Sequence, residues 1–223
     1  MCGIFGIITR TSVDPALYTE LGILNTRRGN LAFGGVIVTG DSIRTFRHAM
    51  PFDGSLVELD GAHTVLSHIR APTGSQSDSI DEVHPFETAD LLLAHNGLLL
   101  NHEAFPQWRI NPVINVDSQV IVGGIQHHLD TGLTVEDAIC HTVETLNGQQ
   151  ACWLWHKPTG SIYLWRVMSA VYCGQQAERF VFSSVQHPMT PSQLDEGILY
   201  HLDRPTLGLE PVGEFAYYSP YRT

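Results

Sequence analysis

Met1-Cys2-Gly3-Ile4-Phe5-Gly6-Ile7 is the stretch around which the rest of the chain is organised. Because cysteine is small, removal of Met1 is expected to leave Cys2 as the first residue, with a free α-amine beside its thiol. The ordinary pKa is about 8.5 for the thiol and about 7.7 to 8.0 for the amine, so the amine can accept the thiol proton near neutral pH. The stretch therefore predicts an amine-activated nucleophile. The alternative is a cysteine that simply begins a buried strand.

The composition narrows the function classes open to the 223-residue chain. Its 12 basic and 23 acidic residues give a formal charge of −11, which argues against a surface for polyanions such as nucleic acids. No apolar run approaches the roughly 18 residues of a membrane span, and no signal-peptide pattern opens the chain. We therefore expect a cytoplasmic protein with neither nucleic-acid nor membrane partners.

The cysteines and histidines predict neither disulfides nor a metal site. The four cysteines are far apart in the sequence and show no C-x-x-C spacing, so reduced thiols are expected: Cys2, Cys140, Cys152 and Cys173. The 12 histidines are scattered and form no H-E-x-x-H motif.

Short apolar strands make up most of the expected secondary structure. We expect strands at 3–9, 36–38, 42–49, 63–68, 90–94 and 98–100, and later at 151–156, 161–167, 171–173 and 179–183. The Asn96-Gly97 dipeptide predicts a tight turn between the strands at 90–94 and 98–100. A glycine pair at 34 and 35 indicates either a close backbone approach or ordinary packing.

Helices are expected where capping residues precede an apolar repeat. Asp14-Pro15 predicts the start of one helix, which ends before Gly29. Asn101 is expected to cap a short helix through 105, and Asp117 to open a longer one. Thr134 with Asp137 approximates a capping box for a helix through 146. Without a linker or repeat, residues 1–223 are expected to form one domain with two sheets and a few helices.

Five motifs, taken together and in this order, resemble the glutaminase domain of class II glutamine amidotransferases. They are Cys2-Gly3-Ile4-Phe5-Gly6, Arg27-Arg28-Gly29, HIRAPTG at 68–74, His95-Asn96-Gly97 with Asn101, and DSQVI at 117–121. The resemblance covers nearly the whole chain. It implies an α+β fold, a four-layer αββα sandwich of the N-terminal-nucleophile hydrolase type with two antiparallel sheets between helices. This agrees with the two sheets expected from the local patterns.

The resemblance also implies the catalytic roles. Cys2 attacks the side-chain amide carbon of glutamine, and its α-amine passes the proton to the departing ammonia. Water then hydrolyses the resulting glutamyl thioester. The Asn96 side-chain amide and the Gly97 backbone N–H match the family's oxyanion hole, which stabilises the charge of the tetrahedral intermediate.

Substrate binding is implied for three further residues. Arg70 matches the arginine that holds the α-carboxylate of glutamine, with Thr73 assisting. The alternative is that Arg70 is an ordinary surface arginine, as most arginines are. Asp117 matches the carboxylate that holds the α-ammonium. The loop departs from the family because Ala71-Pro72 stand where an aromatic residue often follows the arginine. No cofactor and no metal are implied.

The resemblance leaves the fate of the ammonia open. Fused relatives carry a second catalytic domain, whereas this sequence ends at residue 223. We therefore expect a stand-alone glutaminase that passes ammonia to a separate synthetase or transferase. One alternative is a hydrolase of another γ-glutamyl amide without ammonia transfer. A second is a non-catalytic regulatory or binding module of the same fold, which would be expected to have lost part of the site.

Overall fold

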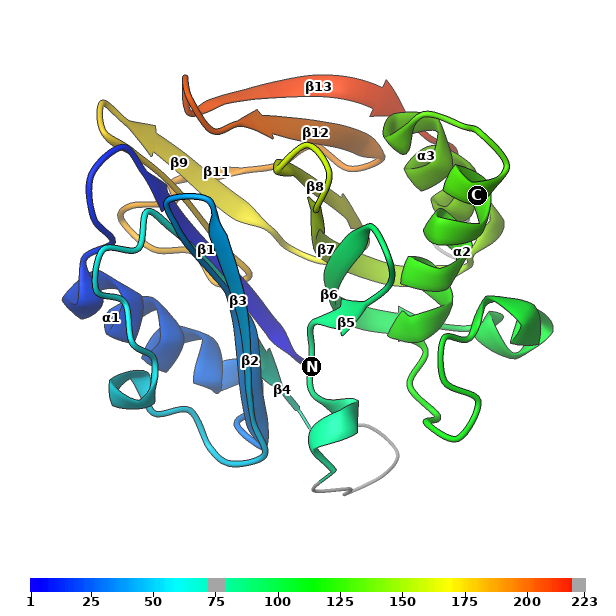
Figure 1. Cartoon of the computed structure of the whole chain (residues 1–223), viewed down its shortest axis with the longest axis horizontal. Helices are drawn as coiled ribbons and strands as arrows, with labels where there is room; N and C mark the ends of the chain where they lie inside the picture. The colour runs from blue at the N-terminus through cyan, green and yellow to red at the C-terminus, as the bar shows by residue number, and fades with distance from the viewer. Residues whose placement is uncertain (72–78, 218–223) are drawn as a thin grey trace.

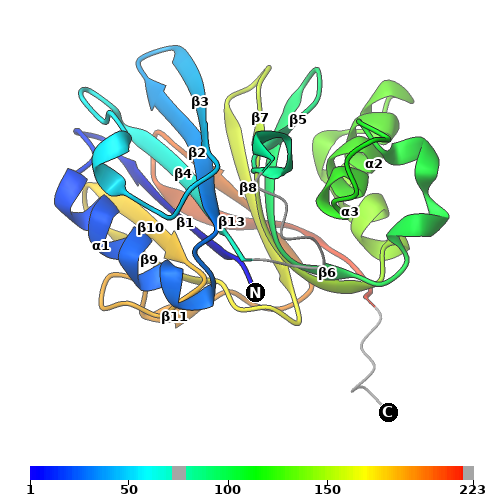
Figure 2. The same cartoon turned by 90° about the horizontal axis from the view of Figure 1, so that it is seen from below.

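The computed structural model describes residues 1–71 and 79–217 and consists of two face-to-face antiparallel sheets between helices (Figure 1). Helix α1 (Pro15–Asn25) covers the outer face of one sheet. Helices α2 (Ser118–Asp130) and α3 (Val135–Thr145) cover the outer face of the other, as the view from below shows (Figure 2). The layer order is helix, sheet, sheet, helix, so the predicted αββα architecture is confirmed.

Within the described residues the first sheet has seven strands, and β1, which follows Cys2, lies inside it. Its order is β11 (Ser192–Gln193), β9 (Tyr172–Gln176), β10 (Arg179–Ser183), β1 (Gly3–Thr9), β4 (Thr64–Arg70), β2 (Ala32–Thr39) and β3 (Ser42–His48). Because β1 pairs with β4 so that Gly3 lies opposite Ile69, the start of β1 and the end of β4 lie at the same end of the sheet. This register brings the Cys2 and Arg70 motifs together.

The second sheet has six strands in the described residues. Its order is β13 (Gly208–Glu214), β12 (Ile198–Asp203), β8 (Ser161–Val167), β7 (Gly148–His156), β6 (Leu91–Leu99) and β5 (Phe86–Glu87). Short 3-10 helices connect the elements at η1 (Thr26–Arg28), η2 (Gly54–Leu56), η3 (Ile80–Glu82), η4 (His102–Ala104) and η5 (Pro106–Trp108).

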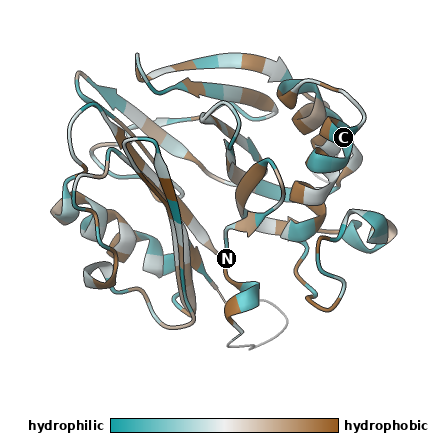
Figure 3. Ribbon diagram, viewed as in Figure 1, coloured by the Kyte–Doolittle hydropathy of each residue, from teal (hydrophilic) through white to brown (hydrophobic). Residues whose placement is uncertain are grey.

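Apolar side chains fill the three spaces between the four layers, and brown stretches alternate with paler and teal ones along the strands in Figure 3. Successive side chains of a strand point to opposite faces, and β6 shows the consequence. Leu91 and Leu93 pack toward α2 and α3, whereas Leu92 and Ala94 pack between the sheets. By the same alternation, the side chain of residue 95 faces the helices and that of residue 96 faces the space between the sheets.

The predicted turn at Asn96-Gly97 is wrong, because β6 runs from Leu91 to Leu99 without a break. Both residues pair with β7, Asn96 opposite Ala151 and Gly97 opposite Gln150. Glycine is required at 97 by space: a Cβ there would lie 1.8 Å from the backbone oxygen of Gln149. The dipeptide therefore reflects close packing of two strands, and the oxyanion-hole motif lies within a strand.

Of the four residues predicted to start helices, two cap the following helix with their side chains. The Asp14 side chain accepts a hydrogen bond from Ala16 N at 2.9 Å, and Thr134 Oγ1 accepts one from Asp137 N at 3.1 Å. Asn101 does not cap η4 with its side chain, which instead hydrogen-bonds to residues 145 and 147. Among the described residues, no helix has the length and apolar character needed to cross a membrane.

Candidate active site

A cavity of about 480 Å³ collects four of the six predicted site residues: Cys2, Arg70, Gly97 and Asp117. These residues come from the position before β1, the end of β4, the C-terminal part of β6 and the position before α2, so the cavity joins both halves of the sandwich. Asn96 does not line the cavity, and Thr73 lies outside the described residues.

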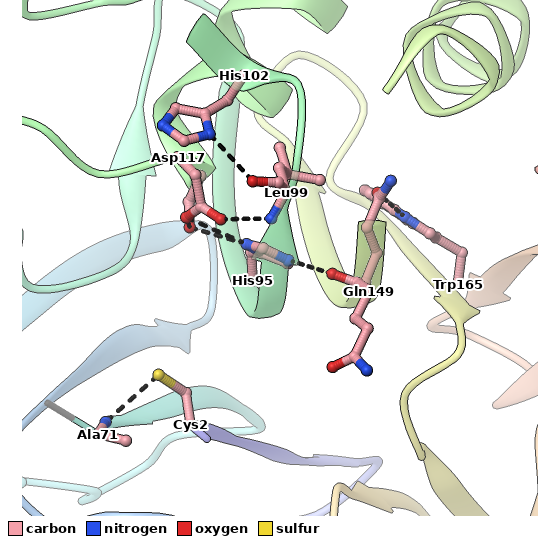
Figure 4. Close-up of polar contacts among 10 residues, drawn as sticks. Cys2, Ala71, His95, Leu99, His102, Asp117, Gln149 and Trp165 are labelled. Carbon is pink, nitrogen blue, oxygen red and sulfur yellow. Dashed lines mark hydrogen bonds and ion pairs between the residues drawn. The ribbon is translucent and has the colours of Figure 1, made fainter. Parts of the chain in front are cut away.

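The thiol of Cys2 is buried at the edge of this cavity, where 8% of the residue is exposed. Its Sγ accepts a hydrogen bond from Ala71 N at 3.3 Å (Figure 4), and its carbonyl oxygen accepts one from Arg28 Nε at 2.7 Å. Burial raises the pKa of the thiol, and the Ala71 N–H partly offsets that rise. A nucleophile in this position therefore needs a nearby base, and Met1, whose removal would free the α-amine of Cys2, is exposed.

Arg70 ends β4 with its side chain buried, and its guanidinium forms an ion pair with the carboxylate of Glu82 from η3. The side chain of Glu82 is also largely buried, at 15% exposure, so the pair is shielded from solvent and screened little by salt. The sequence offered no signal for this partner. A substrate carboxylate that binds Arg70 has to share it with Glu82 or displace Glu82.

Asp117 occupies the N-cap position of α2, but its carboxylate does not cap the helix. Instead Oδ2 accepts a hydrogen bond from Leu99 N at 2.8 Å (Figure 4), and Oδ1 accepts one from Ser118 Oγ at 3.3 Å. The carboxylate is thereby turned toward β6 and the cavity. The end of β6 fixes the position of this negative charge.

His95 is a positioning residue that the sequence motif contains but to which it gave no role. Its side chain faces the helices, with Nδ1 2.9 Å from Ser118 Oγ and Nε2 3.0 Å from the backbone oxygen of Gln149 (Figure 4). Nδ1 also lies 3.9 Å from Asp117 Oδ1. One imidazole thus joins β6, β7 and the start of α2. Recognising 95–97 as strand, with alternating faces, would have predicted this orientation.

Asn96 is fully buried, and by the alternation along β6 its side chain faces the space between the sheets. Its Nδ2 donates to Ser184 Oγ at 3.3 Å. That oxygen also accepts from Ile4 N at 3.0 Å, while Ser184 N donates to the Ile4 oxygen at 2.8 Å. Ser184 therefore ties Asn96 on β6 to the beginning of β1, two residues after Cys2.

Two histidines are buried near Arg70: His68 and His84, of which His84 lines the cavity. Their ring centroids are 4.0 Å apart. Burial lowers the pKa of His68 to about 3 and holds the pKa of His84 well below its ordinary value. Both rings are therefore neutral near pH 7 and add no positive charge beside Arg70. Within 1–71 and 79–217, no group of three or more His, Cys, Asp or Glu residues is arranged to hold a metal ion.

Sequence comparison finds two kinds of relative, amidophosphoribosyltransferases and isomerizing glutamine–fructose-6-phosphate aminotransferases. The amidophosphoribosyltransferase of Pasteurella multocida is 30% identical over 173 residues, which cover 68% of this chain and 34% of the relative. The isomerizing glutamine–fructose-6-phosphate aminotransferase of Halalkalibacterium halodurans is 26% identical over 184 residues, covering 79% of this chain and 30% of the relative. The chain belongs to the class II glutamine amidotransferases. It thereby joins an enzyme family whose nucleophile is an N-terminal cysteine.

Solved structures show the same fold for this amidotransferase chain. The glutamine phosphoribosylpyrophosphate amidotransferase of B. subtilis superposes with a TM-score of 0.73 at 19% identity, over 94% of this chain and 49% of the other. A glutamine aminotransferase class-II domain protein from Silicibacter pomeroyi gives a TM-score of 0.61 at 13% identity, over 96% of this chain and 100% of the other. The chain spans about a third of the length of the curated relatives it matches. No family model matches it.

Proposed function

We propose that this chain hydrolyses the side-chain amide of glutamine and releases ammonia for transfer to an acceptor. The observation that carries the proposal is the single cavity shared by a buried thiol, a guanidinium and a carboxylate: Cys2, Arg70 and Asp117. A nucleophile and two opposite charges in one cavity match a substrate that carries an amide at one end and an α-carboxylate and α-ammonium at the other.

In the proposed reaction Met1 is removed and the α-amine of Cys2 takes the proton from the thiol. Sulfur attacks the amide carbon, the C–N bond breaks, and the amine returns the proton to ammonia. Water then cleaves the thioester to glutamate and restores the thiol. Because burial raises the pKa of Cys2, an adjacent base is needed near neutral pH, which supports the role of the α-amine.

The oxyanion hole is proposed to consist of Asn96 Nδ2 and Gly97 N–H. An amide NH₂ has two donor hydrogens. The contact with Ser184 Oγ uses one of them and fixes the plane of the amide. The second is then available to the oxyanion, so Ser184 supports the geometry without competing for the same hydrogen. Donors fixed before the reaction stabilise developing charge without further reorganisation.

The far end of the substrate is proposed to bind between two opposite charges. Arg70 takes the α-carboxylate in place of, or together with, Glu82, and Asp117 takes the α-ammonium while it keeps its hydrogen bond from Leu99 N. Thr73 is proposed to assist at the carboxylate, but it lies outside the described residues.

For the ammonia acceptor we propose a separate synthetase or transferase, with residues 1–223 as one glutaminase domain. The solved class-II domain protein from Silicibacter pomeroyi supports this, because the match covers 100% of that chain. The curated relatives, of which about a third is matched, correspond to the fused arrangement. Glutaminase activity of the purified chain that rises when a partner is added from the source would support separate subunits.

Intact-protein mass spectrometry after treatment with a glutamine analogue carrying a diazoketone tests the nucleophile. The expected result is one adduct on a chain that has lost Met1, mapped to Cys2 and prevented by excess glutamine. Cys2→Ala should give no adduct and no hydrolysis, whereas Cys152→Ala, which removes another buried thiol, should label and react normally. Retention of Met1 in an active preparation would contradict the amine-assisted mechanism. Faster cleavage of γ-glutamyl amides of large amines than of glutamine would contradict the substrate assignment.

A further inference from the structure

A second cavity, of about 660 Å³, shares no lining residue with the cavity at Cys2. It lies at the opposite end of β1, which runs from the N-terminus across the molecule (Figure 1). Its walls come from residues 8–11, the segment before β4, the turn between β7 and β8, and residues 201–205. Two arginines of this wall, Arg10 and Arg204, are the features that the glutaminase proposal leaves unused.

Arg10 follows the last residue of β1 and is fixed to two neighbouring loops through backbone oxygens. Its Nε donates to the Pro205 oxygen at 3.2 Å, Nη2 to the Thr206 oxygen at 3.1 Å and Nη1 to the Ala177 oxygen at 3.5 Å. No carboxylate of the described residues forms an ion pair with it. The contacts orient the guanidinium but leave its charge uncompensated.

Arg204 is half-buried, and its guanidinium lies 5.0 Å from the ring centroid of Trp155. Its Nη2 is 3.5 Å from His63 Nδ1, a long contact, and among the described residues it makes no ion pair. Burial lowers the pKa of Arg204. The negative charge of Asp41, which lies beyond ion-pair distance, raises that pKa in part. Stacking on an indole holds a planar guanidinium in place and leaves its edge free for an anion.

The charge and polarity of the cavity contrast with those of the whole chain. The chain carries a formal charge of −11, whereas the cavity wall carries two arginines and one carboxylate, Asp203. Asp203 Oδ2 already accepts hydrogen bonds from the N–H and the hydroxyl of Thr206. The hydroxyls of Thr11, Thr159 and Ser161 add neutral hydrogen-bonding groups to the wall.

We propose that this cavity binds a small phosphorylated molecule, with its phosphate between Arg10 and Arg204. Each guanidinium has five donors in a planar fork that matches phosphate oxygens. The contacts described above use three donors of Arg10 and one of Arg204. The volume falls within the roughly 300–1,000 Å³ typical of small-molecule sites. The hydroxyl groups of the wall then meet the uncharged part of the ligand.

Titrations of the full chain with inorganic phosphate and with glycerol 3-phosphate test the site, at constant ionic strength set with sodium chloride. We expect saturable binding of both, and tighter binding of glycerol 3-phosphate. In a nitrogen-15 spectrum, the indole N–H of Trp155 should shift, whereas that of Trp165, which is bonded to Gln150 Oε1 in the second sheet, should not. A Trp155→Phe variant assigns the signal.

Arg10→Gln and Arg204→Gln should each weaken phosphate binding at least tenfold. Arg44→Gln provides the matched control: Arg44 is an exposed arginine on β3 outside the cavity, and its loss should leave binding unchanged. Glycerol tests whether the uncharged part of the ligand binds without the phosphate. Succinate tests whether any dianion binds equally well. Absence of saturable binding, equal binding by the double Arg10→Gln/Arg204→Gln variant, or equal affinity for succinate would overturn the proposal. Thermal unfolding of each variant shows whether it is folded.

Discussion

The two halves of the active-site cavity are held in place by different means. On the first-sheet side, the pairing of β1 with β4 sets the positions of Cys2 and Arg70, and the Arg70 side chain forms an ion pair with that of Glu82. On the second-sheet side, hydrogen bonds orient the side chains of Asn96 and Asp117. Asn96 bonds to the Ser184 side chain, and Asp117 bonds to Leu99 N and to the Ser118 side chain.

We call the side with Cys2 and Arg70 the strand-held half and the side with Asn96 and Asp117 the side-chain-held half. The difference between them shows which half of the site is robust to mutation. Strand pairing fixes a backbone whatever the neighbouring side chains are, so a substitution on the first side should act mainly through the group it removes. A side-chain network transmits a change, because each member orients the next. Four predictions test this contrast, beginning with the largest effect.

Asn96→Ala removes a proposed oxyanion donor from the side-chain-held half. We expect kcat for glutamine hydrolysis to fall by about 10²–10³ with little change in KM, because the interaction forms only as charge develops on the oxygen. Steady-state kinetics on the chain without Met1 measures both constants. A variant with normal kcat would remove Asn96 from the oxyanion hole.

Asn96 also shows how far the sequence alone could lead. The motif order, with Cys2 first, was enough to predict the αββα fold and four residues of the cavity. The Asn96-Gly97 dipeptide was misinterpreted as a turn, because local propensity favours a turn whereas the close approach of Gln149 on β7 decides the conformation.

The partners that complete the site could not be predicted in this way. Glu82 forms its ion pair with Arg70 from 12 residues further along the chain. Ser184 forms its hydrogen bond with Asn96 from 88 residues further along. Their hydroxyl and carboxylate groups are common surface groups. Only the tertiary arrangement of the two sheets identifies which of many serines and glutamates contact the site.

Arg70→Lys keeps the charge on the strand-held half but removes the planar fork. We expect KM for glutamine to rise about 10- to 100-fold, the equivalent of roughly 1.5–3 kcal/mol for charge-assisted hydrogen bonds. The change in kcat should be smaller, since the carboxylate is held in both ground and transition states. Arg44→Lys, at an exposed site on β3, is the control. A KM that stays within twofold of the original value would contradict carboxylate binding by Arg70.

Lowering the pH should reduce the free energy of unfolding through His68, which lies on β4 in the strand-held half. This histidine is buried and neutral, and its pKa is lowered to about 3. The unfolded chain binds a proton near pH 6.5 and the native chain does not. Stability is therefore fully present above about 6.5 and decreases as pH falls from there toward 3.

The expected loss between pH 7.5 and 5.5 is about 1.4 kcal/mol for this histidine, since one pKa unit corresponds to that free energy. Urea unfolding at both pH values measures it. His68→Leu should reduce the pH-dependent loss by about that amount, whatever its effect on absolute stability. An equal loss in both proteins would show that His68 is not the titrating group.

Ser184→Ala tests the hydroxyl that joins the two halves. Ser184 Oγ accepts from both Ile4 N and Asn96 Nδ2. We expect kcat to fall about fivefold, the equivalent of roughly 1 kcal/mol for one neutral hydrogen bond, because the Asn96 amide loses its anchor. Steady-state kinetics and urea unfolding measure the effect on activity and on stability.

Ser183→Ala is the matched control for Ser184→Ala. Ser183, the last residue of β10, is buried as Ser184 is. Its Oγ accepts hydrogen bonds from Asn25 Nδ2 at 2.9 Å and from Val185 N at 3.1 Å. Both variants should lose about 1–2 kcal/mol of unfolding free energy, because each leaves buried donors unpaired. Only Ser184→Ala should lower kcat. If both lower it equally, general loosening of the first sheet explains the effect. The side-chain-held half would then depend on the strand-held half for stability alone, and not for the orientation of Asn96.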